Sequence, residues 1–212
     1  MVRVKFCGIK SLPDALAAAR LGVNALGFIF VKDTPRYIDP LEAAEIINAL
    51  SPLIMRVGVF VNSDISEVEE IAAKCRLDII QLHGEERSEF CSKIKERYRV
   101  IKTLKVKDEI IIDEVSKYLD TVDAILLDTF SERALGGTGK SFNWDIAREL
   151  RSCGIPIILS GGLNSENIKV AIKEVNPYAV DVSSGIEKSP GVKDHELMGE
   201  FIASLWEEEW GL

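Results

Sequence analysis

Residues 2–30 read VRVKFCGIKSLPDALAAARLGVNALGFIF and contain a complete strand–helix–strand unit. Two apolar runs rich in β-formers flank an Ala- and Leu-rich segment with helical spacing. Ser11 is suited to cap the start of this helix, Pro13 to its first turn and Gly22 to its end. The stretch therefore predicts two parallel strands joined by a right-handed helical crossover.

The same alternation continues to the end of the chain. Strands are predicted at eight places: 2–7, 24–30, 54–61, 78–83, 98–104, 122–128, 155–160 and 178–183. Helices are predicted between and after them, at 13–21, 41–50, 65–74, 88–96, 109–119, 145–152, 167–174 and 195–208. Because no linker-like segment interrupts this pattern, we expect one α/β domain over residues 1–212, closed as a (β/α)₈ TIM barrel. An open doubly wound sheet is the alternative.

Composition narrows the class of partner. The chain has 212 residues and a net charge of -8, with a sequence pI near 5.0, so it has no basic surface for nucleic acid. No apolar run is long enough to cross a membrane, and the start does not resemble a signal peptide. We therefore expect a cytoplasmic protein, monomeric or homodimeric, that acts on a small molecule.

The cysteines and histidines do not form a ligand pattern. Only two histidines are present, and the four cysteines lie far apart, at Cys7, Cys75, Cys91 and Cys153. Neither a disulfide framework nor a zinc site has this spacing. We expect free thiols and no metal.

Catalytic groups of a (β/α)₈ barrel lie at the carboxyl ends of the strands and in the loops that follow. Polar residues and glycines at these ends are Cys7, Gly8, Arg36, Asn62, Gln81, His83, Asp128, Ser160, Gly161, Gly162, Asp181, Ser183, Ser184 and Gly185. Strand alternation places Cys7, Lys5 and Arg3 on the inner face of the barrel. A lysine buried there needs an acidic partner, and Asp181 on the closing strand is the predicted one.

Two glycine-containing turns predict a phosphate site. Ser160-Gly161-Gly162 and Ser183-Ser184-Gly185 follow the seventh and eighth strands, where this fold often binds phosphate through backbone N–H groups. Gly137 and Gly139, in the long loop after Asp128, would add further amides, and residues 129–135 of that loop are predicted to form a lid. Tight turns without a ligand are the simpler alternative.

Cys7 and Asp128 are the candidates for proton transfer, because a barrel places their strands across the mouth from each other. A thiol accepts a proton near neutral pH only if its pKa is lowered, and Lys5 and Lys10 are the cations predicted to do so. Partial burial would raise the pKa of Asp128 and suit it to act as an acid. Each also has a structural alternative, as a small core residue and as a turn cap.

Three other polar side chains are candidates for substrate contact. The planar fork of Arg36 matches a carboxylate, although an arginine in a loop can equally be solvated. His83, with Gln81 two residues earlier on the same strand face, is placed to contact a substrate, although a single histidine at a strand end more often serves packing.

Several motifs, in chain order, resemble phosphoribosylanthranilate isomerases. They are residues 5–10 (KFCGIK), 34–38 (TPRYI), 59–62 (VFVN), 81–84 (QLHG), 127–128 (LD), 136–139 (GGTG), 142–144 (FNW), 159–163 (LSGGL) and 181–187 (DVSSGIE). The resemblance implies a cofactor-free Amadori rearrangement in tryptophan biosynthesis, from N-(5-phosphoribosyl)anthranilate to 1-(2-carboxyphenylamino)-1-deoxyribulose 5-phosphate.

The resemblance also assigns roles. It implies that Asp128 is the general acid and Cys7 the general base, that Arg36 binds the anthranilate carboxylate, and that Asp181 assists with the hydroxyls or the amine of the substrate. Another phosphosugar barrel, such as indole-3-glycerol-phosphate synthase or a histidine-pathway isomerase, is the nearest enzyme alternative. A catalytically silent barrel that serves as a binding subunit is the alternative from another class.

Overall fold

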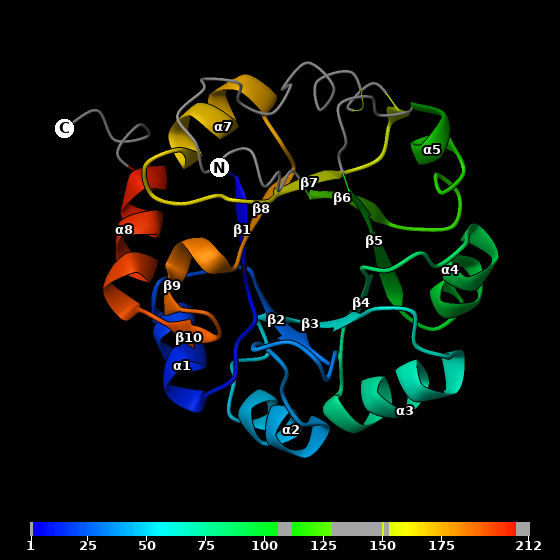
Figure 1. Ribbon diagram of the computed structural model, residues 1–212, viewed down its shortest axis with the longest axis horizontal. Coiled ribbons are helices and arrows are strands. Elements are labelled where there is room, and N and C mark those ends of the chain that lie inside the picture. The colour runs from blue at the N-terminus through cyan, green and yellow to red at the C-terminus, as the bar shows by residue number, and fades with distance from the viewer. Residues whose placement is uncertain (1, 106–111, 129–149, 151–152, 207–212) are drawn as a thin grey trace.

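The computed structural model describes residues 2–105, 112–128, 150 and 153–206. Parallel strands, paired in chain order, close into a barrel (Figure 1). They are β1 (Arg3–Cys7), β2 (Ala25–Ile29), β3 (Met55–Phe60), β4 (Ile79–Leu82), β5 (Arg99–Lys105), β6 (Ala124–Asp128), β7 (Ile157–Ser160) and β8 (Ala179–Val182). Pairing of β1 with β8 completes the ring. The predicted barrel is confirmed, and the open sheet is excluded.

Helices surround this barrel on its outside (Figure 1). They are α1 (Leu12–Arg20), α2 (Pro40–Asn48), α3 (Ile65–Cys75), α4 (Ser88–Lys95), α5 (Ile112–Ser116), α7 (Ile168–Val175) and α8 (His195–Trp206). Of the helix predicted at 145–152, only residue 150 is described, and it is helical. Residues 109–111 and 207–208 of two other predicted helices also lie outside the described residues.

The local signals of the first unit act as predicted. Ser11 is the N-cap of α1, and its Oγ accepts a hydrogen bond from the Asp14 N–H at 3.2 Å. Pro13 lies in the first turn, where its missing N–H costs no helical hydrogen bond. After the helix ends, Gly22 adopts a φ of 76°, a conformation that glycine takes without a steric penalty. The cap, the proline and the glycine together fix where α1 begins and ends, and so where the chain returns to the barrel.

A short segment after β8 was not predicted. It contains the 3₁₀ helix η3 (Ser184–Ile186) and an antiparallel ribbon of β9 (Glu187–Ser189) and β10 (Val192–Lys193). Strands of two or three residues carry no periodicity, so the sequence pattern gives no signal for them. The ribbon matters because it supplies charged residues to the mouth of the barrel.

Two apolar layers hold the fold together. Val4 and Phe6 point outward from β1 as predicted, and Phe6 meets Phe201 of α8 edge to face, with 6.0 Å between the ring centroids. A smaller cluster is made of residues from β4 to β8: Ile79, Ile101, Ala124, Leu126, Ile158 and Ala179. Burial of each large side chain stabilises the fold by about 1.5–3 kcal/mol.

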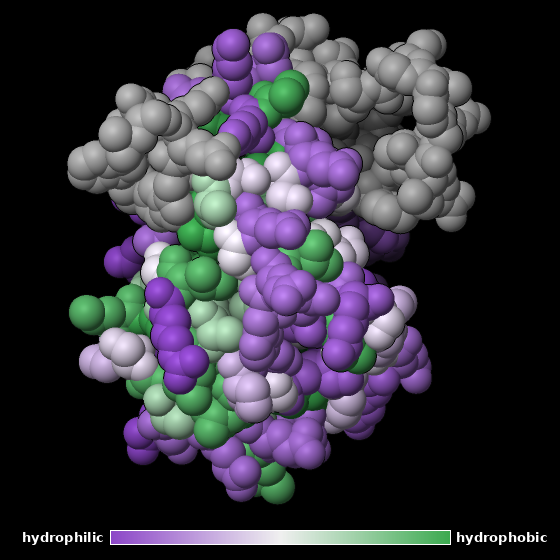
Figure 2. Space-filling view, turned by 90° about the vertical axis from the view of Figure 1, so that its left-hand side faces the viewer, coloured by the Kyte–Doolittle hydropathy of each residue, from purple (hydrophilic) through white to green (hydrophobic). Residues whose placement is uncertain are grey.

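One side of the molecule shows how hydrophilic and hydrophobic residues are distributed on the surface. The side of the molecule that carries α1 and α8 is largely hydrophilic, with smaller groups of hydrophobic residues (Figure 2). In the part of the chain that the structure describes, no helix is both long and apolar enough to span a membrane. All four cysteines are free, as predicted.

Candidate active site

Lys5 and Asp181 form a buried ion pair where β1 meets β8. Their Nζ and Oδ1 atoms are 2.8 Å apart, their side chains are 5% and 6% exposed, and the two residues are register partners. Burial alone would lower the pKa of Lys5, but the charges and hydrogen bonds of Asp181 and Cys7 together outweigh it and raise that pKa. The predicted pairing is confirmed, and it fixes a positive charge beside Cys7.

Cys7 ends β1 and is buried. Gly27 on β2 is its register partner, and an added Cβ there would lie 2.7 Å from the Cys7 Sγ atom. Glycine therefore leaves the space that the sulfur occupies. Sequence reasoning missed this role, because a glycine within a strand has several explanations.

The expected lowering of the Cys7 pKa is wrong. Burial raises the pKa of the thiol and outweighs the opposing charge of Lys5 and, to a smaller extent, Lys193. Lys10 is not among the cations that act on it; its ammonium donates to the Pro35 carbonyl oxygen at 2.8 Å. A thiolate at Cys7 therefore needs a further positive charge nearby.

Arg36, Glu187 and Lys193 form a cluster that links the β2–α2 loop to the unpredicted ribbon. Arg36 donates to both carboxylate oxygens of Glu187, from Nε at 2.9 Å and from Nη2 at 2.6 Å. Lys193 donates to the same carboxylate at 2.9 Å and to the Ser183 carbonyl oxygen at 2.9 Å. The guanidinium is thus held in place by an acid of the protein. Glu187 and Lys193 were not singled out from the sequence, because their ribbon was not predicted.

Asp128 and His83 lie close together at the ends of β6 and β4. His83 Nε2 is 3.4 Å from Asp128 Oδ2, and both side chains are part-exposed. Gln81 is 1% exposed, and its Nε2 atom lies 3.2 Å from His83 Nδ1 and 3.2 Å from Thr103 Oγ1. The structure therefore joins three predicted site residues, but it places Gln81 behind His83 rather than at the surface of the mouth.

The loops after β7 and β8 pack closely together. Gly161 and Gly162 have φ angles of 92° and 64°, which favour glycine. A Cβ on Gly185 would overlap the Leu163 carbonyl oxygen of the neighbouring loop. Ser183 Oγ donates to the Cys7 carbonyl oxygen at 3.1 Å, which ties this region to the candidate base. Ser184 opens the 3₁₀ helix η3.

Two parts of the predicted site lie outside the part of the chain that the structure describes. Gly137 and Gly139, predicted to contribute phosphate-binding amides, lie outside the described residues, as does the predicted lid at 129–135. Within the described ranges, no group of three or more His, Cys, Asp and Glu side chains is arranged to hold a metal ion.

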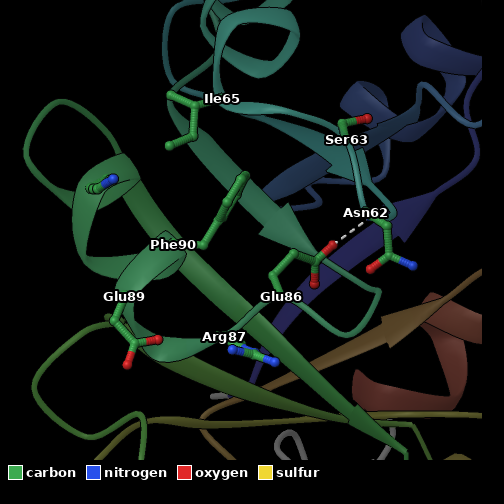
Figure 3. A pocket seen from close by; sticks show the side chains of 8 residues that line it. Asn62, Ser63, Ile65, Glu86, Arg87, Glu89 and Phe90 are labelled. Carbon is green, nitrogen blue, oxygen red and sulfur yellow. Dashed lines mark hydrogen bonds between the residues drawn. The ribbon is translucent and has the colours of Figure 1, made fainter.

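A surface pocket of about 520 Å³ lies beside the mouth, between the starts of α3 and α4 (Figure 3). Asn62 and Glu86 meet in it through a hydrogen bond of 2.8 Å from the Asn62 N–H to the Glu86 carboxylate. Glu86 also pairs with the buried Lys102 at 3.1 Å. Asn62, which has a φ of 51°, accepts from the Glu85 N–H, so its role here is to hold two loops together.

Comparison with known proteins decides the family. Residues 4–204 match the family model described as N-(5'phosphoribosyl)anthranilate (PRA) isomerase. The chain belongs to the phosphoribosylanthranilate isomerase family. It is therefore an aldose–ketose isomerase of tryptophan biosynthesis. Its alternatives as another phosphosugar enzyme or a silent barrel are not supported.

Individual phosphoribosylanthranilate isomerases match along nearly the whole chain. That of Geobacter metallireducens is 51% identical over 202 residues, which cover 95% of this chain and 98% of the relative. The crystal structure of the Thermotoga maritima enzyme superimposes with a TM-score of 0.89 at 44% identity, covering 100% of both chains. A 3-hexulose-6-phosphate synthase, at 14% identity and a TM-score of 0.67, shares the fold only.

One solved structure bears on the ligand. A phosphoribosyl anthranilate isomerase in complex with reduced 1-(o-carboxyphenylamino)-1-deoxyribulose 5-phosphate is 42% identical to this chain, with a TM-score of 0.87 and full coverage of both chains. That relative thus binds a compound with one phosphate and one carboxylate. The roles of individual residues in the present chain stay predictions.

Proposed function

We propose that this isomerase converts N-(5-phosphoribosyl)anthranilate to 1-(2-carboxyphenylamino)-1-deoxyribulose 5-phosphate without a cofactor, with Asp128 as general acid and Cys7 as general base. The observation that carries the proposal is their placement at the carboxyl ends of β6 and β1, in a chain that matches the isomerase family over residues 4–204. In a (β/α)₈ barrel these two ends open onto one mouth.

Ring opening is the first step. Asp128 gives its proton to the furanose ring oxygen, the bond from that oxygen to C1′ breaks, and the lone pair of the anthranilate nitrogen forms an iminium with C1′. His83, 3.4 Å from Asp128, is close enough to orient the carboxyl group. The product of this step carries a positive charge at nitrogen, two bonds from C2′, the carbon that loses a proton next.

Proton removal from C2′ is the second step. Cys7 takes the proton, and the electrons of the C–H bond form the C1′–C2′ double bond and neutralise the iminium. Burial raises the pKa of Cys7, and the new positive charge of the iminium opposes this effect and favours loss of the thiol proton to solvent, so that Cys7 is a thiolate when it takes the C2′ proton. The enolamine then moves its hydroxyl proton to C1′ by way of solvent and becomes the ketone.

The two anionic groups of the substrate are proposed to bind at separate parts of the mouth. Arg36 would hold the anthranilate carboxylate through Nη1, which donates to no described residue while Glu187 occupies Nε and Nη2. Backbone N–H groups near Gly161, Gly162, Ser183, Ser184 and Gly185, joined by those of Gly137 and Gly139, would hold the phosphate. Asp181, fixed by Lys5, would contact a substrate hydroxyl or the amine.

Turnover of purified variants tests the two assignments, followed by the loss of anthranilate–ribose fluorescence. Cys7→Ala and Asp128→Asn are expected to lower kcat by about 10²-fold or more. Cys91→Ala is the matched control for the thiol, because Cys91 is also buried but lies on α4. Asp123→Asn controls for Asp128, because it precedes the same strand, at the opposite end of the barrel. Full activity in Cys7→Ala or Asp128→Asn would remove that residue from the mechanism.

We also propose that residues 1–212 form one catalytic domain that acts in the cytoplasm. Strands from β1 to β8 share a single barrel, which supports one domain. One solved structure, 42% identical to this chain with a TM-score of 0.85, is described as generated monomers of the dimeric phosphoribosylanthranilate isomerase from Thermotoga maritima, so both states exist for that relative. Light scattering of the purified protein decides between monomer and homodimer.

A further inference from the structure

A row of three side chains leads from the interior of the barrel to Asp128. Thr103 on β5 and Gln81 on β4 are 3% and 1% exposed. Gln81 Nε2 lies 3.2 Å from both Thr103 Oγ1 and His83 Nδ1. On the other side of the ring, His83 Nε2 lies 3.4 Å from Asp128 Oδ2. The imidazole is thus held between a buried amide and the candidate general acid.

The orientation of the Gln81 amide follows from the count of donors. With Nε2 toward His83 and Thr103, both amide protons have acceptors, and only Oε1 is left without a partner among the described residues. The reversed amide would place Nε2, with its two protons, at the buried position that offers no partner. A single unpaired acceptor costs less than two unpaired donors, so the first orientation is favoured.

This orientation decides the protonation of His83. An amide NH₂ group only donates, so His83 Nδ1 has to accept and cannot carry a proton. The remaining proton of a neutral imidazole then lies on Nε2, the atom that faces Asp128. A ring with a proton on Nδ1 would set that N–H against the amide protons.

We propose that Gln81 is a positioning residue, which holds His83 as the neutral Nε2–H tautomer and aims that N–H at Asp128. The catalytic consequence rests on the proposed function, in which Asp128 is the general acid. A full positive charge beside Asp128 would hold it ionised, and an ionised carboxyl has no proton to give. A neutral N–H orients the carboxyl group and leaves it able to take up a proton from solvent between turnovers.

Nitrogen NMR of the imidazole rings tests the tautomer without reference to activity. The chain has two histidines, His83 and His195, so His195→Asn assigns both sets of signals; His195 is a surface residue paired with Asp14. In ¹⁵N-labelled, ligand-free protein at neutral pH, we expect His83 Nε2 to be the protonated nitrogen. A protonated Nδ1, alone or with Nε2, would overturn the proposal.

Two variants of Gln81 extend the test. Gln81→Leu removes the donor and is expected to give a mixture of tautomers. Gln81→Glu places a carboxylate against Nδ1 and is expected to move the proton there or to produce the imidazolium. If the Nε2–H signal stays unchanged in both variants, Gln81 does not set the tautomer and the proposal fails. Thermal unfolding of each variant shows that it is folded before its spectrum is compared.

Steady-state kinetics tests the consequence for catalysis. Both variants are expected to lower kcat at least about tenfold, a part of the ~10²–10⁴ that a positioned acid contributes, with KM changed less than about threefold. A KM effect alone would mean that Gln81 contacts substrate and is not a positioning residue. If Asp128→Asn itself keeps full activity, the proposed function fails, and the NMR result still decides the tautomer by itself.

Discussion

Lys102→Met removes one half of a deeply buried ion pair near the mouth. Lys102 points outward from β5, and its side chain and that of Glu86 are each 2% exposed. The ammonium donates to the Glu86 carboxylate at 3.1 Å and to the carbonyl oxygens of Leu82, Gly84 and Thr103. Methionine fills a similar volume but leaves the Glu86 charge without its cation.

Lys102→Met is expected to lower the free energy of unfolding by a large amount for a single substitution. Two unit charges at the observed separation of 3.1 Å attract by about 5 kcal/mol at an effective dielectric constant near 20. Breaking a buried pair from one side typically costs about 3–5 kcal/mol. Because Glu86 keeps hydrogen bonds from the Asn62 and Gly84 N–H groups, we expect about 3 kcal/mol, a substantial part of the ~5–15 kcal/mol that stabilises a domain.

Urea unfolding of a double-mutant cycle measures this cost. Adding Glu86→Gln to Lys102→Met is expected to restore at least about 1 kcal/mol, because no unpaired charge is then buried. Arg97→Met is the matched control: Arg97 pairs with Glu69 at the same 3.1 Å, but the side chains are 66% and 32% exposed. Its expected cost is below about 1 kcal/mol. Equal costs for Lys102→Met and Arg97→Met, or simple additivity in the cycle, would refute the reasoning.

Three further outcomes are expected. Burial would raise the pKa of Glu187, but hydrogen bonds from Arg36 and Lys193 outweigh it and lower that pKa. The stability that this lowering contributes is present above the unfolded pKa of about 4.3 and is lost as pH falls through the folded pKa. The loss of unfolding free energy in Glu187→Gln, measured by urea unfolding, should therefore shrink towards pH 3. Gly185→Ala should destabilise the fold, because the new Cβ would overlap the Leu163 carbonyl oxygen. Gly199→Ala in α8 should stabilise the fold by up to about 1 kcal/mol, because no atom lies within 4 Å of the new Cβ. Thermal unfolding of the two variants compares these effects. Arg36→Ala should raise KM with kcat nearly unchanged, and an unchanged KM would exclude it from substrate binding.

The regular part of the fold was predictable because it depends on local signals that repeat. The cap at Ser11 and the turn at Gly22 lie where the pattern of residues 2–30 placed them. Strand alternation on β1 also placed Lys5 inside and Phe6 outside, and the need of a buried cation for a partner identified Asp181. These inferences need only residues that are close in the sequence and the assumption that the last strand pairs with the first.

The surroundings of the candidate site were less predictable. The ribbon that brings Glu187 and Lys193 to Arg36 has strands too short for a periodic signal. The expected lowering of the Cys7 pKa failed because residue spacing shows which cations are near in sequence but not how completely the sulfur is removed from water.

The sequence by itself determined the family and the barrel and identified the candidate site residues, because strand ends and glycine turns are local features that can be read from short stretches of sequence. Only the tertiary structure decided the burial and pairing of those residues. Gln81 and His83 are two positions apart, yet their relation to Thr103 and Asp128 arises from three neighbouring strands. Burial and hydrogen-bond direction are properties of that assembly, and they set the electrostatics on which catalysis depends.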